Sequence, residues 1–292
     1  MTLKSEQFGT SCARIVYSDG HKDIFKLPYE DVIELFKSAG LVIFRGFATS
    51  PQVMKEFAGR FSSRFNRDRL RPVVEGSNGF VQMVTEGMGY VEPHAEQANS
   101  PFRPDALWFC CSVPAAEGGE TLAWDGVRLW EKLSPDLKQL FRQKKLRFFQ
   151  RYTAEKWQRF MGTAQATLSD VQRTLDGVPG VSYYVSDDES IYLEYVCPAV
   201  VRTRYGDQEA FANSLLSERK NTLGELMSFD DGSQIPEPVV SRIQEAMEDL
   251  TESISWHPGD LAFIDNSRYL HGRNAYTDPR RKIFSSLSFL NF

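Results

Sequence analysis

The chain has 292 residues with a net charge of −5, and 41% of its residues are apolar. This length suits one large domain or two small ones, and the apolar content is ordinary for a globular protein. No basic run accompanies the acidic charge, so we expect no nucleic-acid partner. No apolar stretch approaches the ~20 residues of a membrane span, and the N-terminus lacks the apolar core of a signal peptide. We therefore expect a cytoplasmic protein with no membrane association.

The first half of the chain alternates between helical and strand-like patterns. Apolar residues at helical spacing predict helices over 28–39 and 51–65, with Gly40 as the stop of the first helix. A short apolar strand is predicted between them, over 41–45. Further strands are predicted over 79–84, 106–112 and 120–124, and a helix follows over 135–144.

The second half begins with a predicted hairpin, whose strands cover 181–185 and 190–196. Helices are predicted over 210–216 and 238–253, and strands over 260–265 and 282–289. Many short strands, with helices concentrated at the start and in the middle, predict a mostly β protein with flanking helices and a double-sheet core. We expect one domain over 1–292, with helical insertions around 135–180 and 205–255.

The four cysteines, Cys12, Cys110, Cys111 and Cys197, show no spacing typical of a redox or metal motif. Cys110 and Cys111 are adjacent in an apolar run, and neighbours on a strand face opposite sides. We therefore expect buried thiols rather than a disulfide or zinc framework.

Two histidines and one carboxylate form the strongest candidate site. In His94-Ala95-Glu96 the two polar side chains point to the same side of an extended segment. His271 follows the predicted strand over 260–265, and a jelly roll can place residue 94 beside residue 271 because its strands cross between sheets. Two imidazoles and one carboxylate cap one face of octahedral Fe(II) and leave three positions open. The missing fourth ligand argues against a structural zinc site, but a zinc hydrolase with the same ligands remains an alternative.

The other two histidines are expected to be structural. His257 lies in the turn His257-Pro258-Gly259-Asp260, and His21 lies beside Asp19-Gly20 in an exposed stretch.

An iron oxygenase of this kind needs a source of two electrons, which a keto acid such as 2-oxoglutarate supplies. The distal carboxylate of that acid needs a cation and a hydroxyl. Thr121, after Gly118-Gly119-Glu120, offers the hydroxyl, and the segment Pro279-Arg280-Arg281-Lys282-Ile283 offers guanidinium groups whose planar forks can bind a carboxylate bidentately. An ordinary strand threonine and a solvated basic segment remain the alternative.

The order and spacing of these segments resemble the TauD/TfdA family of Fe(II)- and 2-oxoglutarate-dependent dioxygenases. The resemblance runs from about residue 40 to the C-terminus, and its segments are His94-Ala95-Glu96, Gly118-Gly119-Glu120-Thr121, Trp256-His257-Pro258-Gly259-Asp260, Ile264-Asp265-Asn266, His271-Gly272-Arg273 and Pro279-Arg280-Arg281. It implies a double-stranded β-helix core of the jelly-roll, cupin-like type. It also implies His94, Glu96 and His271 as iron ligands, Thr121 as an aid to 2-oxoglutarate binding, and Arg281 as the partner of its carboxylate.

The chain departs from the family at one position of this pocket. Many members carry a second arginine four residues after the first, where this chain has Ser285. We therefore expect Arg273 to supply the second contact with 2-oxoglutarate, and Arg280 to point away because strand neighbours alternate.

Glu96, in place of the commoner aspartate, is similar to the branch that contains clavaminate synthase and free amino-acid hydroxylases. The segment 229–236 and the C-terminal motifs are similar to SyrP-type members, which act on amino acids carried by peptide synthetases. The resemblance implies hydroxylation, with O2, of an unactivated C–H bond in a small amino-acid-like or natural-product substrate. Desaturation, cyclisation and a noncatalytic β-barrel binding protein are the alternatives, whereas Glu96 disfavours halogenation because halogenase relatives lack this ligand.

Segments near the predicted mouth are candidates for substrate contacts. The segment 64–71 carries Arg64, Arg67, Arg69 and Arg71, which either form a solvated face or bind an anionic substrate or a phosphopantetheine-bearing carrier. Gln97 and Asn99 lie beside the ligands in the sequence and could contact an amino or carboxyl group. The sequence leaves the substrate and the oligomeric state open.

Overall fold

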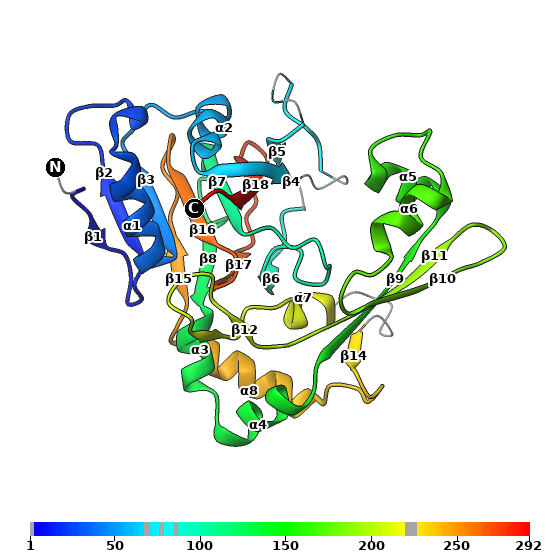
Figure 1. Ribbon diagram of the computed structural model, residues 1–292. Coiled ribbons are helices and arrows are strands. Elements are labelled where there is room, and N and C mark those ends of the chain that lie inside the picture. The colour runs from blue at the N-terminus through cyan, green and yellow to red at the C-terminus, as the bar shows by residue number, and fades with distance from the viewer. Residues whose placement is uncertain (1–2, 67–70, 76, 78, 85–86, 220–226) are drawn as a thin grey trace.

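The structure is a computed structural model of the chain and describes residues 3–66, 71–75, 77, 79–84, 87–219 and 227–292. Two β-sheets face each other at its centre, and helices cover their outer faces (Figure 1). A further sheet projects from this centre with its own helices (Figure 1). None of the helices in these ranges is long and apolar enough to cross a membrane.

The large sheet has the strand order β1-β2-β3-β16-β7-β18-β4, and β5 pairs with β18. Its strands are β1 (Glu6–Gln7), β2 (Arg14–Tyr17), β3 (Leu41–Arg45), β16 (Leu261–Asp265), β7 (Ala106–Val113), β18 (Lys282–Leu290), β4 (Ser62–Asn66) and β5 (Gln82–Met83). The late strand β16 lies between the early strands β3 and β7 and is antiparallel to both. This crossover brings the C-terminal motifs beside the N-terminal half of the chain.

The small sheet has the order β15-β8-β17-β6, and all its pairs are antiparallel. Its strands are β15 (Glu252–Ile254), β8 (Thr121–Asp125), β17 (Tyr269–Arg273) and β6 (Val91–His94). Strand β17 lies in the middle and places its residues opposite both β8 and β6. Residues 91–94, 121–125 and 269–273 are therefore held side by side.

The central strands of the large sheet are buried on both faces, so they read as continuous apolar runs rather than as alternating ones. On β7, Leu107, Phe109 and Cys111 face the small sheet, whereas Trp108 and Cys110 face the helices α1 (Tyr29–Ala39) and α2 (Pro51–Gly59). A short 3-10 turn, η1 (Ile24–Lys26), precedes α1. The buried positions of Cys110 and Cys111 confirm the prediction for this pair, and the described cysteines are all free thiols.

The helices α3 (Gly126–Lys132), α4 (Pro135–Gln143) and α8 (Glu237–Glu248) cover the outer face of the small sheet. The third sheet has the order β10-β11-β9-β14 and contains the predicted hairpin. Its strands are β10 (Val181–Val185), β11 (Ile191–Cys197), β9 (Leu146–Tyr152) and β14 (Met227–Phe229), with helices α5 (Ala154–Met161) and α6 (Leu168–Leu175) on one face. The remaining elements are β12 (Val201–Arg202), β13 (Glu209–Ala210) and α7 (Leu215–Arg219). That the segments 135–180 and 205–255 are insertions in a single domain stays a prediction.

Several predicted boundaries were wrong. The helix predicted over 51–65 ends at Gly59, and the next residues form β4, which pairs with β18. The helix predicted over 238–253 ends at Glu248, and β15 follows and pairs with β8. The segment 210–216 begins in β13 and enters α7 only at Leu215, and the strand predicted over 79–84 is reduced to β5. In the first two cases, pairing with a distant strand overrides the local helical pattern.

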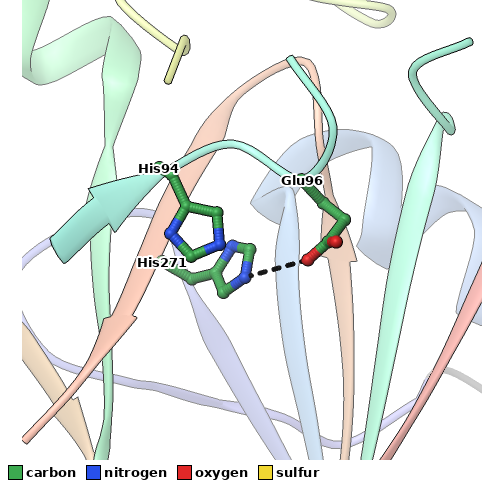
Figure 2. A group of neighbouring side chains, drawn as sticks. All are labelled: His94, Glu96 and His271. Atoms are coloured by element: carbon green, nitrogen blue, oxygen red, sulfur yellow. Dashed lines mark ion pairs between the residues drawn. The ribbon is translucent and has the colours of Figure 1, made fainter. Parts of the chain in front are cut away.

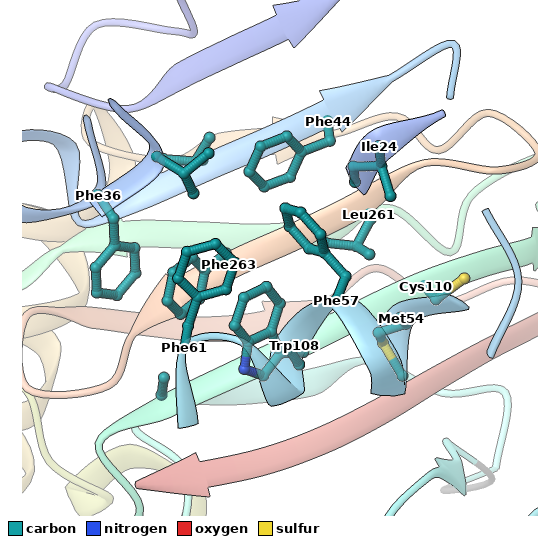
Figure 3. Packing of buried hydrophobic residues seen from close by; sticks show 14 of the residues in the cluster. Ile24, Phe36, Phe44, Met54, Phe57, Phe61, Trp108, Cys110, Leu261 and Phe263 are labelled. Atoms are coloured by element: carbon teal, nitrogen blue, oxygen red, sulfur yellow. The ribbon is translucent and has the colours of Figure 1, made fainter. Parts of the chain in front are cut away.

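A stack of aromatic rings forms the core between the large sheet and its helices (Figure 3). The ring of Phe263 on β16 lies 3.6 Å from that of Phe36 on α1 and 3.7 Å from that of Trp108 on β7, measured between centroids. Both pairs are nearly parallel, and all three side chains are fully buried. Phe263 therefore joins helix and sheet at the centre of this core.

We expect Phe263→Ala to lower the free energy of unfolding by about 3–5 kcal/mol, because it removes the central ring of the stack and leaves a cavity. Urea unfolding followed by tryptophan fluorescence measures this loss. Phe160→Ala is the control, since Phe160 lies on α5 and is 42% exposed. Equal losses in the two variants would contradict the role given to Phe263.

Candidate active site

The two histidines of the predicted triad lie opposite each other on neighbouring strands. His94 ends β6, His271 lies in the middle of β17, and the antiparallel register makes them direct partners. Their ring centroids are 4.3 Å apart. Glu96 follows β6 on a loop that turns its carboxylate back toward both rings (Figure 2). One ligand atom from each of the three side chains lies within 4.8 Å of the others.

The loop that carries Glu96 is fixed by Asn266, which follows β16. The backbone N–H of Glu96 donates to Oδ1 of Asn266 over 2.8 Å, and Nδ2 of Asn266 donates back to the Glu96 carbonyl over 2.9 Å. A second donation from Nδ2 reaches the carbonyl of Pro104. The sequence had marked Asn266 only as a turn residue, because its partner is 170 positions away.

The donor atoms of the triad suit a metal cation. Nδ1 of His94 lies 2.8 Å from the carbonyl oxygen of Glu92, which can only accept, so this nitrogen carries the proton and Nε2 keeps a lone pair. Nε2 of His271 faces Oε2 of Glu96 at 3.4 Å. Within the described ranges no group donates a hydrogen bond to this buried Oε2. Unshared lone pairs therefore converge on one point.

The electrostatic surroundings keep the ligands in the protonation states that metal binding requires. Burial raises the pKa of the Glu96 carboxyl, but the positive charge of Arg71 and the nearby ring of His271 outweigh it and hold the pKa well below its usual range. Burial and the neighbouring His94 lower the pKa of His271 to about 4, although Glu96 acts in the opposite direction. The carboxylate is thus ionised and the imidazole neutral at physiological pH.

A cavity beside the triad brings together the residues predicted for 2-oxoglutarate. Thr121, Arg273 and Arg281 line the same cavity as His94 and His271. Thr121 on β8 is the direct partner of Arg273 on β17, which explains how two residues 152 positions apart meet. The structure thus brings these residues to one cavity, and their role in binding 2-oxoglutarate stays a prediction.

Local contacts orient Thr121 and Arg281. Nε1 of Trp256 donates to Oγ1 of Thr121 over 3.0 Å, which leaves the hydroxyl proton available to another acceptor. Nε and Nη2 of Arg281 both donate to the carbonyl of Gly119. Gly119 has a φ of +71°, and a Cβ there would lie 2.9 Å from Nε of Arg281. Only glycine allows this close approach.

The two arginines make one end of the cavity electropositive. Arg273 donates through Nη2 to the carbonyls of Gly87 and Gly89, and both guanidinium groups lie 5.0 Å from the ring centroid of Tyr276. Burial and then the positive charge of Arg273 lower the pKa of Arg281. Arg280, by contrast, is exposed and pairs with Asp278, so it points away as predicted.

The arginines of the segment 64–71, predicted near the mouth of the site, differ in their positions relative to the cavity. Arg71 lines the cavity, whereas Arg64 lies exposed on β4 and packs on the ring of Phe289. Arg67 and Arg69 lie outside the described residues.

Gln97 and Asn99 do not line the cavity; they tie the loop to its neighbours. Oε1 of Gln97 accepts from Asn66, and Nδ2 of Asn99 donates to Glu218. Gln97 has a φ of +53°, a left-handed conformation directly after Glu96 that turns the chain away from the site. A substrate contact for these two side chains stays a prediction.

Comparison with known proteins identifies the family. Residues 3–287 match the family described as taurine catabolism dioxygenase TauD, TfdA family. The chain belongs to the TauD/TfdA family. Its members are Fe(II)- and 2-oxoglutarate-dependent oxygenases that use O2, and the chain is an enzyme of this class, as its sequence predicted.

The similar proteins share only a modest fraction of the sequence with this chain. A clavaminate synthase-like protein of Arabidopsis thaliana is 23% identical over 280 residues, which cover 87% of this chain and 82% of the relative. The 3-((Z)-2-isocyanoethenyl)-1H-indole synthase of Fischerella ambigua is 22% identical over 265 residues, covering 89% and 85%. The dapdiamide synthesis protein DdaC of Enterobacter agglomerans is 22% identical over 292 residues, covering 90% and 86%.

Solved structures share the fold. PvcB of Pseudomonas aeruginosa has a TM-score of 0.62 at 15% identity and covers 99% of this chain and 90% of its own. AAD-2, solved with Mn(II) and N-oxalylglycine, has a TM-score of 0.64 at 13% identity and covers 100% and 98%. PvcB is described as an Fe, alpha-ketoglutarate dependent oxygenase. These likenesses confirm the predicted jelly-roll fold class.

We expect His94→Ala and His271→Ala to abolish tight Fe(II) binding, because each leaves only two protein donors on the metal. Anaerobic calorimetric titration with Fe(II) measures this directly. His257→Ala is the matched control. His257 lies in a turn, and its contact with Asp260 is made by its backbone N–H rather than by its ring. Fe(II) binding that survives in either of the first two variants would refute the ligand assignment.

Proposed function

We propose that this enzyme holds Fe(II) between His94, Glu96 and His271 and hydroxylates an unactivated C–H bond of a small organic substrate. The observation that carries the proposal is the convergence of these two imidazoles and one carboxylate within 4.8 Å. Three protein ligands on one face leave three positions for 2-oxoglutarate and O2. When bound, the iron supplies oxygen activation and 2-oxoglutarate supplies two electrons.

In this proposal the distal carboxylate of 2-oxoglutarate binds between Thr121 and Arg281. The threonine donates its hydroxyl proton, since its oxygen already accepts from Trp256. The guanidinium of Arg281 is held in place by Gly119 and binds the carboxylate as a planar fork. Arg273, directly opposite Thr121, adds a second positive charge at this end.

The walls of the cavity keep water from the reacting centre. Val84, Phe109 and Ile283 line it with apolar groups, and the ring of Phe109 lies edge-on to that of His271 with centroids 5.6 Å apart. A dry, shaped cavity is what the protein contributes to chemistry performed on a bound metal.

The substrate in this proposal is a small amino-acid-like molecule or natural product, with an amino acid tethered to a carrier protein as the alternative form. The named product of the Fischerella relative contains a carbon–carbon double bond. Desaturation is therefore the second candidate outcome, followed by cyclisation. Hydroxylation adds one oxygen atom to the product, whereas desaturation and cyclisation each remove two hydrogen atoms.

We expect purified protein with Fe(II), 2-oxoglutarate and O2 to form succinate, and a pool of amino acids and related metabolites to stimulate this reaction. Mass spectrometry of the pool distinguishes a gain of oxygen from a loss of hydrogen. His94→Ala is the inactive control. Failure to form succinate with every pool, together with tight retention of zinc, would instead favour the zinc hydrolase alternative.

We expect Arg281→Met to raise the KM for 2-oxoglutarate by about 10- to 100-fold, because a charged hydrogen bond contributes about 1.5–3 kcal/mol. Steady-state succinate formation at varied 2-oxoglutarate measures this. Arg280→Met removes the same charge one position earlier, where the side chain is exposed and pairs with Asp278, so its KM stays at the wild-type value. Equal KM values in both variants would place the carboxylate elsewhere.

A further inference from the structure

An aromatic side chain outside the sequence motifs contacts two arginines of the cavity. Tyr276 lies on the connection from β17 in the small sheet to β18 in the large sheet. Arg273 ends the first of these strands, and Arg281 immediately precedes the second. The centres of both guanidinium groups lie 5.0 Å from the ring centroid of Tyr276, within the ~6 Å over which a cation and a ring attract each other. One ring therefore links the cationic side chains at the two ends of this connection.

The backbone around Tyr276 is held from two sides. Its N–H donates to the carbonyl of Met88 over 2.9 Å, and a β-bridge pairs Tyr276 with Gly118. Gly118 has a φ of +69°, and a Cβ there would overlap the carbonyl oxygen of Ala275. The hydroxyl of Tyr276 also donates to the carbonyl of Gly87 over 3.3 Å. These contacts keep the ring against the two arginines.

The ring and several carbonyl groups hold two like charges in one place. Arg281 donates to the carbonyl of Gly119, and Arg273 donates to the carbonyls of Gly87 and Gly89. Burial and then the positive charge of Arg273 lower the pKa of Arg281, so the two groups are close enough to repel each other. A carbonyl oxygen or the face of a ring attracts a cation but carries no net charge. These contacts therefore fix the guanidinium groups and do not cancel their charges.

Two arginines that bind one anion must first be ordered. Each loses the rotamer freedom of a long side chain, and the pair must stay together against its mutual repulsion. A ring that already attracts both groups reduces this cost before the ligand binds. We propose that Tyr276 is a positioning residue for 2-oxoglutarate, whose ring holds Arg273 and Arg281 where they bind the distal carboxylate. This inference rests on the proposed function, in which that carboxylate binds at Arg281.

The test titrates 2-oxoglutarate into the anaerobic complex of the full chain with Fe(II) and follows the visible absorption band. Tyr276→Leu keeps an apolar side chain but removes the ring, and it weakens the affinity for 2-oxoglutarate by about 5- to 30-fold. Tyr276→Phe keeps the ring without the hydroxyl, so it binds 2-oxoglutarate within about twofold of the wild type. Calorimetric titration shows an unchanged affinity for Fe(II) in both variants, because the contacts of the ring are with arginines rather than with the proposed metal ligands.

Two further measurements separate positioning from general support of the fold. Tyr184→Leu makes the same substitution on β10, where the side chain is 56% exposed, and it binds 2-oxoglutarate as the wild type does. In an Arg281→Met background, Tyr276→Leu weakens the affinity less than it does in the wild type, since one of the two groups that the ring holds is already gone. Fully additive losses would show that the ring does not act through Arg281 and would overturn the proposal.

Three other outcomes also overturn it. Tyr276→Leu could bind 2-oxoglutarate like the wild type, or its affinity for Fe(II) could fall together with that for 2-oxoglutarate. Tyr276→Phe could be as weak as Tyr276→Leu, which would assign the role to the hydroxyl and its contact with Gly87. In each case a wild type that forms the band leaves the proposed function standing. If the wild type forms no band with Fe(II) and 2-oxoglutarate, the proposed function itself fails first, and the inference about Tyr276 fails with it.

Discussion

The antiparallel register between β6 and β17 is the constraint on which the site depends. It makes His94 and His271 direct partners, although 177 positions separate them in the chain. Because side chains alternate along a strand, a slip of one residue would turn one of the imidazoles to the other face of the sheet. The same strand β17 pairs on its other side with β8, which brings Thr121 opposite Arg273. One central strand therefore aligns both the proposed metal ligands and the residues proposed to bind 2-oxoglutarate.

The sheets beneath this strand are supported by charged groups that are buried in pairs. Asp260 accepts three hydrogen bonds from the guanidinium of Arg45, and Asp125 accepts two from Arg268. A buried carboxylate is costly unless it is paired and hydrogen-bonded. Both pairs are stable because each carboxylate is met by a planar fork. The carboxylate of Glu96 is different, because no group in the described part of the chain donates a hydrogen bond to its Oε2.

The sequence predicted the site better than it predicted the boundaries of the elements. Spacing alone predicted that His94 and Glu96 face the same side, although a turn after β6 rather than an extended strand carries Glu96, and the paired glycines before Thr121 predicted a turn. Such patterns are local, so they are visible in one sequence. The role of Asn266 depends on a partner 170 positions away, and the strands β4 and β15 are set by pairing with distant strands. These features arise only when the chain folds.

Arg71 shows how a charged group can enter the cavity from outside the segments that carry the sequence motifs. Its guanidinium donates to Ser285 on the last strand, more than 200 positions further along the chain. The cation is supplied by the segment that precedes β5, and that segment is held to the sheet through the bridge between Val73 and Gln82. The charge of the cavity is therefore set by side chains from several segments that meet only in the folded chain, so a single motif does not reveal it.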